Sequence, residues 1–213
     1  MDVSKMRKVA ILGKANSGKN TTANLIAKAL CKSELEYKIM AFADPIKEMV
    51  LEMFPWADHQ CLYGSSKWRS KLLTTDAGKG KSLVSYRQVL IDLGSQARAY
   101  NENHWINVFD FLVRIHPITS DYRNDSHIDY NLIIVPDARY RNEFDYLRAN
   151  GYFMIKIFRD SDAPIINHSS ETNQDQIKNE EFDFIIDNNG TLERLQENIK
   201  TIVENIRKSQ PYG

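Results

Sequence analysis

The chain has 213 residues, a length that predicts one domain able to bury a full hydrophobic core. Hydrophobic residues make up 42% and charged residues 26%, the composition of an ordinary globular protein. Lysine plus arginine equals aspartate plus glutamate at 28 each, which excludes a histone-like or polybasic DNA-binding protein, so we expect no nucleic-acid polymer as partner.

The spacing of apolar residues predicts strands and helices that alternate along the chain. Strands are expected at 9–12, 38–42, 132–135, 153–158 and 182–186, and helices at about 25–30, 45–54, 86–97, 105–115, 140–149 and 192–206. Asp44-Pro45 reads as an N-cap followed by proline at the first helical position. From about 55 to 81 the periodicity is lost, and we expect a mobile segment outside the core.

Repeated strand–helix units predict an α/β fold with a parallel sheet and helices on both faces. The sequence contains no internal repeat and no linker, so residues 1–213 are expected to form a single domain.

The two cysteines and the N-terminus bear on the cellular compartment. Cys31 and Cys61 fit no metal-binding spacing and no disulfide framework, which is typical of reduced thiols in a cytosol. Residues 1–8 have no apolar leader, and no apolar run approaches the roughly 20 residues that cross a bilayer. We therefore expect a cytoplasmic protein without a membrane partner.

One motif points to phosphate chemistry. The segment Gly13, Lys14, Ala15, Asn16, Ser17, Gly18, Lys19 matches G-x-x-x-x-G-K. Glycines let the backbone curl so that N–H groups face phosphate oxygens, and a following helix adds its positive dipole end. The Lys19 ammonium would meet the β- and γ-phosphates. A chance match in a turn is the alternative, but this motif lies between an expected strand and an expected helix, where a phosphate loop must lie.

The residue after the lysine is usually Ser or Thr, whose hydroxyl binds Mg²⁺. Here it is Asn20, followed by Thr21. An amide oxygen can bind Mg²⁺ directly or through water, so we expect Asn20 to take part in the metal site. A GTPase is disfavoured because no Asn-Lys-x-Asp element occurs and Asp137 is not followed by x-x-Gly.

Further blocks carry a resemblance to one enzyme family. Gly13–Thr21 is similar to G-x-x-x-S-G-K-D-T and Phe42–Glu48 to F-A-D-P-L-K-E, and more blocks follow in the same order at Arg87–Arg98, Val135–Glu143, Ile157–Arg159 and His168–Glu171. Together they resemble the deoxynucleoside monophosphate kinases found mainly in bacteriophages. The chain departs from the family pattern at Asn20 (usually Asp), Ile91 (usually Gln) and Gln96 (usually Glu), which bears on metal binding and base recognition.

The resemblance implies a three-layer α/β/α P-loop kinase fold with a five-stranded parallel sheet. It also implies a nucleotide-binding arm at about 43–115 and a short lid at about 159–181. ATP and Mg²⁺ would be the cofactors, a dNMP the acceptor and a dNDP the product. Lys47 and Glu171 would belong to the acceptor-binding set, Glu171 beside His168 in the lid. The bases accepted, and the choice between monomer and homodimer, stay open.

Phosphoryl transfer depends on positioning and positive charge, and ligands of open α/β sheets bind at the carboxyl edge of the strands. Arg139 and Arg141 follow one expected strand at that edge and Arg159 follows the next. We expect Arg139 and Arg159 to clamp the transferred group or the acceptor phosphate. Surface salt bridges are the alternative, with even odds for Arg141. Asp137 ends the same strand and would hold Mg²⁺ through water, or else cap a helix.

Four more positions are candidates for acceptor binding. Asp44 would cap its helix, contact the acceptor, or do both. Arg87 and Arg98 are eleven residues apart on one expected helix and so share a face suited to a phosphate, or to solvent. In the segment 55–81, Trp68 and Arg69 could stack on a base and touch its phosphate, although a hydrated loop is the commoner role.

Three other functions stay open on sequence alone. The first is another P-loop small-molecule kinase, such as a dephospho-coenzyme A kinase or a nucleoside kinase. The second is a nucleotide-dependent switch without transfer activity, and the third is a degenerate partner subunit. The blocks at Phe42–Glu48 and Val135–Glu143 favour the dNMP kinase.

Overall fold

The computed structural model describes residues 6–33, 36–74, 84–115, 130–160 and 177–209. Two compact units are present. The sheet unit comprises Met1–Ala41 and Asp110–Gly213, and the helical unit comprises Phe42–Phe109. Each unit is described by itself below. No helix within the described ranges combines the length and apolar character that crossing a membrane requires.

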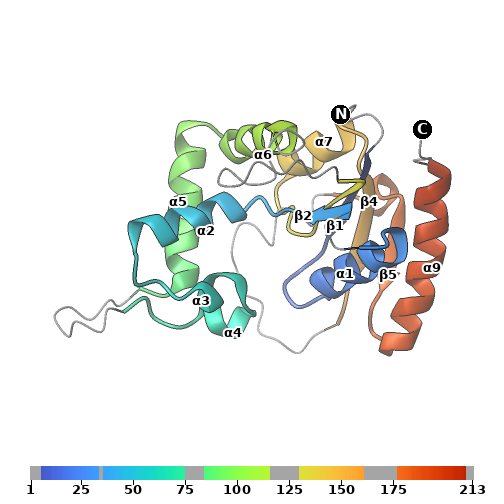
Figure 1. Ribbon diagram of the computed structural model, residues 1–213, viewed down its shortest axis with the longest axis horizontal. Helices are drawn as coiled ribbons and strands as arrows, with labels where there is room; N and C mark the ends of the chain where they lie inside the picture. The colour runs from blue at the N-terminus through green and yellow to red at the C-terminus, as the bar shows by residue number, and fades with distance from the viewer. Residues whose placement is uncertain (1–5, 34–35, 75–83, 116–129, 161–176, 210–213) are drawn as a thin grey trace. The chain divides into compact units, whose positions relative to one another are not determined.

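The sheet unit contains five parallel strands, as predicted (Figure 1). They are β1 (Arg7–Leu12), β2 (Tyr37–Ile39), β3 (Leu132–Val135), β4 (Phe153–Phe158) and β5 (Phe184–Asp187). Their order across the sheet is β2-β3-β1-β4-β5. The central strand β1 therefore lies between β3 and β4, the two strands whose ends carry the candidate arginines.

Helices cover both faces of this sheet, which confirms the three-layer prediction. On one face, α1 (Lys19–Leu30) and α9 (Leu192–Ser209) pack over a cluster that includes Val9 and Ile11 of β1. Ala10 and Leu12 are equally buried but point to the opposite face, because side chains alternate along a strand. There α7 (Arg141–Ala149) contributes buried apolar side chains of its own. Burial on both faces explains why the strands read as continuous apolar runs.

Several strand boundaries differ from the sequence prediction, and two of the differences leave an apolar residue outside the strand. β2 ends at Ile39 rather than continuing to Phe42, although the Met40 amide still donates to the carbonyl oxygen of Ile134 at 3.0 Å. β5 begins at Phe184 rather than at Phe182, because Phe182 follows the short 3₁₀ helix η4 (Asn179–Glu181) and packs edge-on against Phe144. In both places an apolar side chain packs against another aromatic ring instead of extending the strand.

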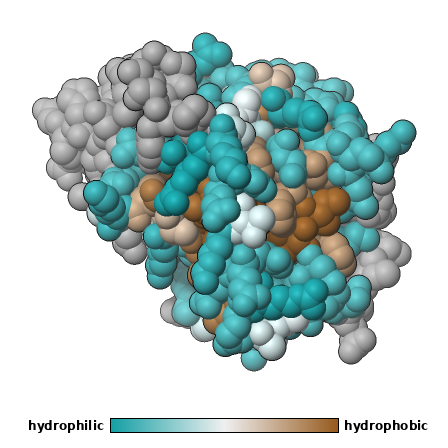
Figure 2. All heavy atoms as spheres, turned by 90° about the vertical axis from the view of Figure 1, so that its right-hand side faces the viewer, coloured by the Kyte–Doolittle hydropathy of each residue, from teal (hydrophilic) through white to brown (hydrophobic). Residues whose placement is uncertain are grey.

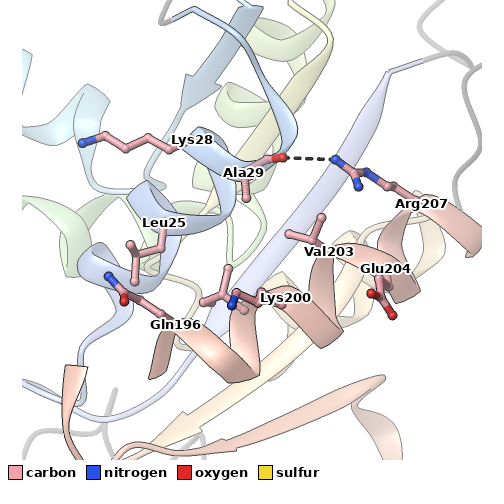
Figure 3. Close-up of a pocket in the computed structure, with 9 residues that line it drawn as sticks. Leu25, Lys28, Ala29, Gln196, Lys200, Val203, Glu204 and Arg207 are labelled. Carbon is pink, nitrogen blue, oxygen red and sulfur yellow. Dashed lines mark hydrogen bonds between the residues drawn. The ribbon is translucent and has the colours of Figure 1, made fainter. Parts of the chain in front are cut away.

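The α1–α9 side of the sheet unit is mostly hydrophilic at its surface, with a smaller apolar area (Figure 2). A shallow pocket opens between the two helices, and Leu25 and Val203 line it beside Lys28 and Lys200 (Figure 3). At one end Arg207 donates to the carbonyl oxygen of Ala29 at 3.2 Å. Leu25 lies six residues beyond the start of α1, about 9 Å along its axis, so this pocket is separate from the loop at residues 13–18.

The helical unit consists of α2 (Asp44–Met53), α3 (His59–Tyr63), α4 (Ser66–Arg69), α5 (Tyr86–Tyr100) and the start of α6 (His104–Ile115). The prediction of a mobile, coreless segment at 55–81 is wrong for the part described, residues 55–74. Cys61, Leu62 and Leu73 are buried there in one cluster with Val50 and Tyr86. The helices α3 and α4 are too short to show an apolar period, so no helical pattern is visible in this segment of the sequence. Glycines and lysines around them reinforced the wrong interpretation.

Both cysteines are buried free thiols. Burial raises the pKa of Cys31 to about 11, and burial also raises the pKa of Cys61. Each therefore stays protonated and poorly nucleophilic at neutral pH, in keeping with a structural rather than a catalytic role.

Candidate phosphoryl-transfer site

The loop between β1 and α1 is a compact turn. The Ser17 amide donates to the carbonyl oxygen of Lys14 at 3.3 Å, which closes the loop on itself. Asn16 and Gly18 both have positive φ angles, 63° and 101°. Such angles turn successive peptide groups so that their N–H bonds can face one point, the arrangement that binds anions. The turn therefore has the local geometry that the motif requires.

Two glycines of the loop leave no room for a side chain. A Cβ on Gly13 would overlap the carbonyl oxygen of Ile157 on the neighbouring strand β4. A Cβ on Gly18 would lie 2.5 Å from the side-chain nitrogen of Asn188, on a backbone angle that L residues rarely adopt. The loop is thus packed against the ends of β4 and β5, so only these glycines allow its path.

We expect Gly18→Ala to lower the free energy of unfolding by about 2 kcal/mol or more, from strain at positive φ plus displacement of Asn188. Gly151→Ala is the matched control. Gly151 also has a positive φ of 75°, but nothing lies within 4 Å of its added Cβ, so it should cost only about 1 kcal/mol. Urea denaturation of both variants measures the difference. Equal losses would show that Asn188 does not pack on the loop.

Lys19 is the first residue of α1, and its side chain folds back over the loop. Its Nζ donates to the carbonyl oxygens of Gly13 and Lys14, both at 2.6 Å. The ammonium is thereby held above the same backbone whose N–H groups would meet a phosphate. Ser17 is 2% exposed, and its hydroxyl has no hydrogen-bond partner among the described residues. An orphaned buried hydroxyl at a helix N-terminus is what a bound phosphate oxygen would satisfy.

The remaining loop residues behave differently from one another. The side chains of Lys14, Ala15, Asn16, Asn20 and Thr21 are exposed. Thr22 is fully buried, and its hydroxyl also lacks a hydrogen-bond partner in the part of the chain that the structure describes. The exposed set borders the turn, where a nucleotide would contact it.

The sheet order brings the ends of three strands together. β3 and β4 both pair in parallel with β1, so residues following them lie at the same edge as the loop after β1. Asp137 follows β3 and is half-buried, whereas Arg139 and Arg159 are exposed. The predicted clustering of these three positions at the carboxyl edge is what this topology produces.

Glu143 is a residue that the sequence reasoning did not assign a role. It is 3% exposed, and its carboxylate accepts hydrogen bonds from the backbone amides of Arg139 (2.8 Å) and Tyr140 (3.2 Å). It thus fixes the turn that carries Arg139. A signal existed, because glutamate at the third position of a helix commonly reaches back to the amides before it.

Arg141 engages two carboxylates on the surface of the sheet unit. Its guanidinium lies 2.9 Å from Asp145 and 2.8 Å from Glu181. The hydrogen bonds that Arg141 donates to these carboxylates raise the pKa of Arg141, and the bond from Arg141 lowers the pKa of Glu181. The pair with Glu181 ties α7 to the segment before β5. This is the structural role that was considered as the alternative to phosphate binding.

Two oxygen donors suit a hard cation. Asn20 lies in the first turn of α1, where its exposed side-chain amide is next to the loop, and Asp137 follows the adjacent strand β3. Carboxylate and amide oxygens are ligands that Mg²⁺ accepts, and substrate phosphates usually complete its shell. Within the described ranges, no group of three or more histidine, cysteine, aspartate or glutamate side chains could hold a metal alone.

In the helical unit, Asp44 and Lys47 form an ion pair at 2.7 Å in the first turn of α2. Ala43, not Asp44, is the N-cap, which corrects the expected boundary by one residue. The Lys47 ammonium lies 4.6 Å from the centre of the Tyr63 ring, and Tyr63 donates to Glu48. These contacts keep a cation and two carboxylates together at one end of α2.

Arg87 and Arg98 are half-buried and lie on the single helix α5, as expected from their spacing. Arg98 donates to the carbonyl oxygen of Gly94 at 3.3 Å, and the buried Trp105 donates to the same oxygen at 3.0 Å. Gly94 packs closely on Ile46 of α2. The Arg98 side chain is therefore held along its own helix by its hydrogen bond to Gly94.

The tryptophan and arginine of α4 have local contacts. Lys71 lies 3.5 Å above the centre of the Trp68 ring, and Arg69 donates to the carbonyl oxygen of Gly64 at 2.8 Å. Both side chains thus form part of a folded element. Glu171 and His168 lie outside the described residues.

Comparison with known proteins adds an independent line of evidence. A family model described as deoxynucleotide monophosphate kinase matches residues 85–199, just over half of the chain. A protein of Acanthamoeba polyphaga mimivirus, assigned as a deoxynucleotide monophosphate kinase, is 28% identical over 202 residues, covering 92% of this chain and 96% of that protein. The deoxynucleotide monophosphate kinase of Enterobacteria phage T4 is 29% identical over 99 residues, covering 46% of this chain and 40% of its own length.

Among solved structures, an unliganded sugar kinase from Janibacter aligns over 93% of this chain and 95% of its own, with 16% identity and a TM-score of 0.40. That likeness is too low to support an argument about function. The family match stands on its own, and it agrees with the resemblance of the sequence blocks. The chain is a phosphotransferase acting on a nucleotide, and it belongs to the deoxynucleotide monophosphate kinase family.

Proposed function

We propose that the chain transfers the γ-phosphate of ATP to a deoxynucleoside monophosphate, giving ADP and a deoxynucleoside diphosphate. The observation that carries this proposal is the compact turn at residues 13–18, with Lys19 folded over it and the buried Ser17 hydroxyl unpaired. Family membership supplies the acceptor class. An oxygen of the acceptor phosphate forms a bond to the γ-phosphorus, while the bond from that phosphorus to the β–γ bridging oxygen breaks.

The loop residues 13–21 would bind the ATP phosphates. Backbone N–H groups of the turn and the N-terminus of α1 stabilise negative charge, and Lys19 would exchange its two carbonyl contacts for phosphate oxygens. The ammonium already lies beside the loop, so a small rearrangement of the Lys19 side chain would bring it to the β–γ bridging oxygen. Negative charge grows on that oxygen in the transition state.

Arg139 and Arg159 would neutralise the equatorial oxygens of the transferred group. Both follow strands that flank β1, and the turn of Arg139 is fixed by Glu143. Asp137 and Asn20 would hold Mg²⁺, whose chemistry when bound is to offset phosphate charge and to align the β- and γ-phosphates. Arg141, already paired with two carboxylates, is the weakest member of this set.

The acceptor would bind to the arm at about 43–115, because that segment carries suitable polar groups. Residues at about 159–181 would form the lid. Asp44, Lys47, Arg87 and Arg98 are the principal candidates, since arginine and lysine bind phosphate and carboxylate accepts from sugar hydroxyls. Trp68, Arg69 and Glu171 complete the set of proposed acceptor contacts. Residues 1–213 would act as one kinase domain with these two moving parts.

A panel of acceptors tests the proposal. With ATP and Mg²⁺, we expect coupled detection of ADP to show turnover with one or more of dAMP, dGMP, dCMP and dTMP. Deoxynucleosides and dephospho-coenzyme A should give turnover lower by about 10²-fold or more, because the acceptor phosphate would be absent or misplaced. Turnover confined to a nucleoside or to dephospho-coenzyme A would reject the dNMP acceptor. ATP binding without turnover on any acceptor would favour a switch.

A further inference from the structure

The loop after β5 reaches across the sheet unit to the phosphate loop. Asn188 follows β5 directly, and its side-chain amide donates to the carbonyl oxygen of Ser17 at 2.8 Å, a contact between residues 171 apart in sequence. Ser17 is the residue whose buried hydroxyl has no partner among the described side chains and backbone groups. The contact therefore acts on the peptide group that joins Ser17 to Gly18, in the middle of the proposed anion-binding turn.

Asn188 and Gly18 fit together sterically. Gly18 has a φ of 101°, and the space left by its missing Cβ is filled by the side-chain nitrogen of Asn188. A peptide group whose carbonyl is bonded on one side presents its N–H to the other. The Asn188 bond thus favours the orientation in which the Gly18 N–H faces the interior of the turn.

The segment that carries Asn188 is itself anchored. The backbone N–H of Asn188 donates to the carbonyl oxygen of Phe158 at 2.9 Å. Asn189 exchanges two hydrogen bonds with Asp160, one from the Asp160 amide at 2.7 Å and one to its carboxylate at 3.1 Å. A third bond joins the Asn189 amide to Asp187 at 3.0 Å. A donor on such a fixed segment loses little entropy when it holds a second loop.

We propose that Asn188 is a positioning residue for the phosphate loop, which sets the orientation of the Ser17–Gly18 peptide before ATP binds. This inference rests on the proposed function and deepens it. Without the bond, ATP must order the loop itself, so part of its binding free energy is spent on that step. The consequence should fall on ATP, because the proposed acceptor contacts do not include this peptide.

The test compares Asn188→Ala with Asn188→Gln and with a matched control. We expect Asn188→Ala to raise the KM for ATP by about 10-fold, which is the change in an equilibrium constant that the loss of roughly one hydrogen bond produces. The KM for the dNMP should stay unchanged. Asn188→Gln keeps an amide donor and should recover part of the loss. Asn150→Ala removes another side-chain amide bonded to a backbone carbonyl, at 2.8 Å to Tyr146 on α7, and should change neither constant.

The outcomes separate this inference from the proposed function. A purely structural role would lower the active fraction, and hence kcat, with both KM values unchanged, and that result would overturn the inference. So would an equal rise in both KM values, or wild-type kinetics in Asn188→Ala. In each of these cases the transfer reaction itself would still be observed in the wild-type protein. Absence of dNMP-dependent turnover in the wild type would instead reject the proposed function.

Discussion

Lys19→Ala should reduce phosphoryl transfer by about 10³-fold or more, measured as kcat at saturating ATP and dNMP. The ammonium is bonded at 2.6 Å to the carbonyl oxygens of Gly13 and Lys14 in the turn. Its positive charge would stabilise the negative charge that develops on the β–γ bridging oxygen. Removing it takes away an interaction that is strongest in the transition state, so kcat should fall more than ATP affinity.

The fold should survive this change. Lys19 is half-buried and its ammonium makes two hydrogen bonds to the loop, so we expect the free energy of unfolding to change by no more than about 1 kcal/mol. Lys28→Ala is the control, because Lys28 is an exposed lysine on the same helix, nine residues further on. Near-normal turnover in Lys19→Ala would mean that the turn is not the transfer site.

Arg139→Ala should lower kcat by about 10²-fold or more, the scale of one lost charge contact in the transition state. Arg139 is exposed at the end of the strand next to β1, on a turn that Glu143 fixes through the Arg139 amide. Because that anchor uses the backbone, the substitution leaves the turn in place and removes only the side chain. A lowered kcat with an unchanged unfolding free energy is the expected signature.

Arg114→Ala serves as the matched control for Arg139. Arg114 is also an exposed arginine of the sheet unit, 74% exposed and paired with Asp110 at 2.9 Å on α6. Exposed pairs of this kind contribute little to stability, and this one is not among the proposed site residues. If both variants kept wild-type kcat, surface salt bridging would be the better account of Arg139.

Much of the sheet unit could be predicted from local sequence. β1, β3 and β4 are buried on both faces, so they read as unbroken apolar runs, and the P-loop motif lies between the first of them and its helix. The topology then follows from strand–helix alternation, which brings the ends of β3 and β4 beside the loop. The positions of Asp137, Arg139 and Arg159 at this edge of the sheet were predictable because they depend only on this order, whereas their roles stay predictions.

Other features depend on contacts that no local pattern records. The Asn188–Ser17 bond joins residues 171 apart, and Asn-Asn-Gly after a strand indicates only a turn. In the buried cluster, Cys61 and Leu62 lie on a helix of only five residues and Leu73 lies outside any helix, so their positions complete no helical period. Arg141 was ambiguous for a related reason, since its partner Glu181 lies 40 residues away. Such side chains acquire their roles from tertiary packing.

The most direct test of the account is a crystal structure with a non-hydrolysable ATP analogue, Mg²⁺ and a dNMP. We expect the β-phosphate to lie within hydrogen-bond distance of backbone N–H groups between residues 15 and 19, with Lys19 Nζ moved from the carbonyls of Gly13 and Lys14 onto phosphate oxygen. A triphosphate bound elsewhere, with Lys19 still on those two carbonyls, would contradict the account.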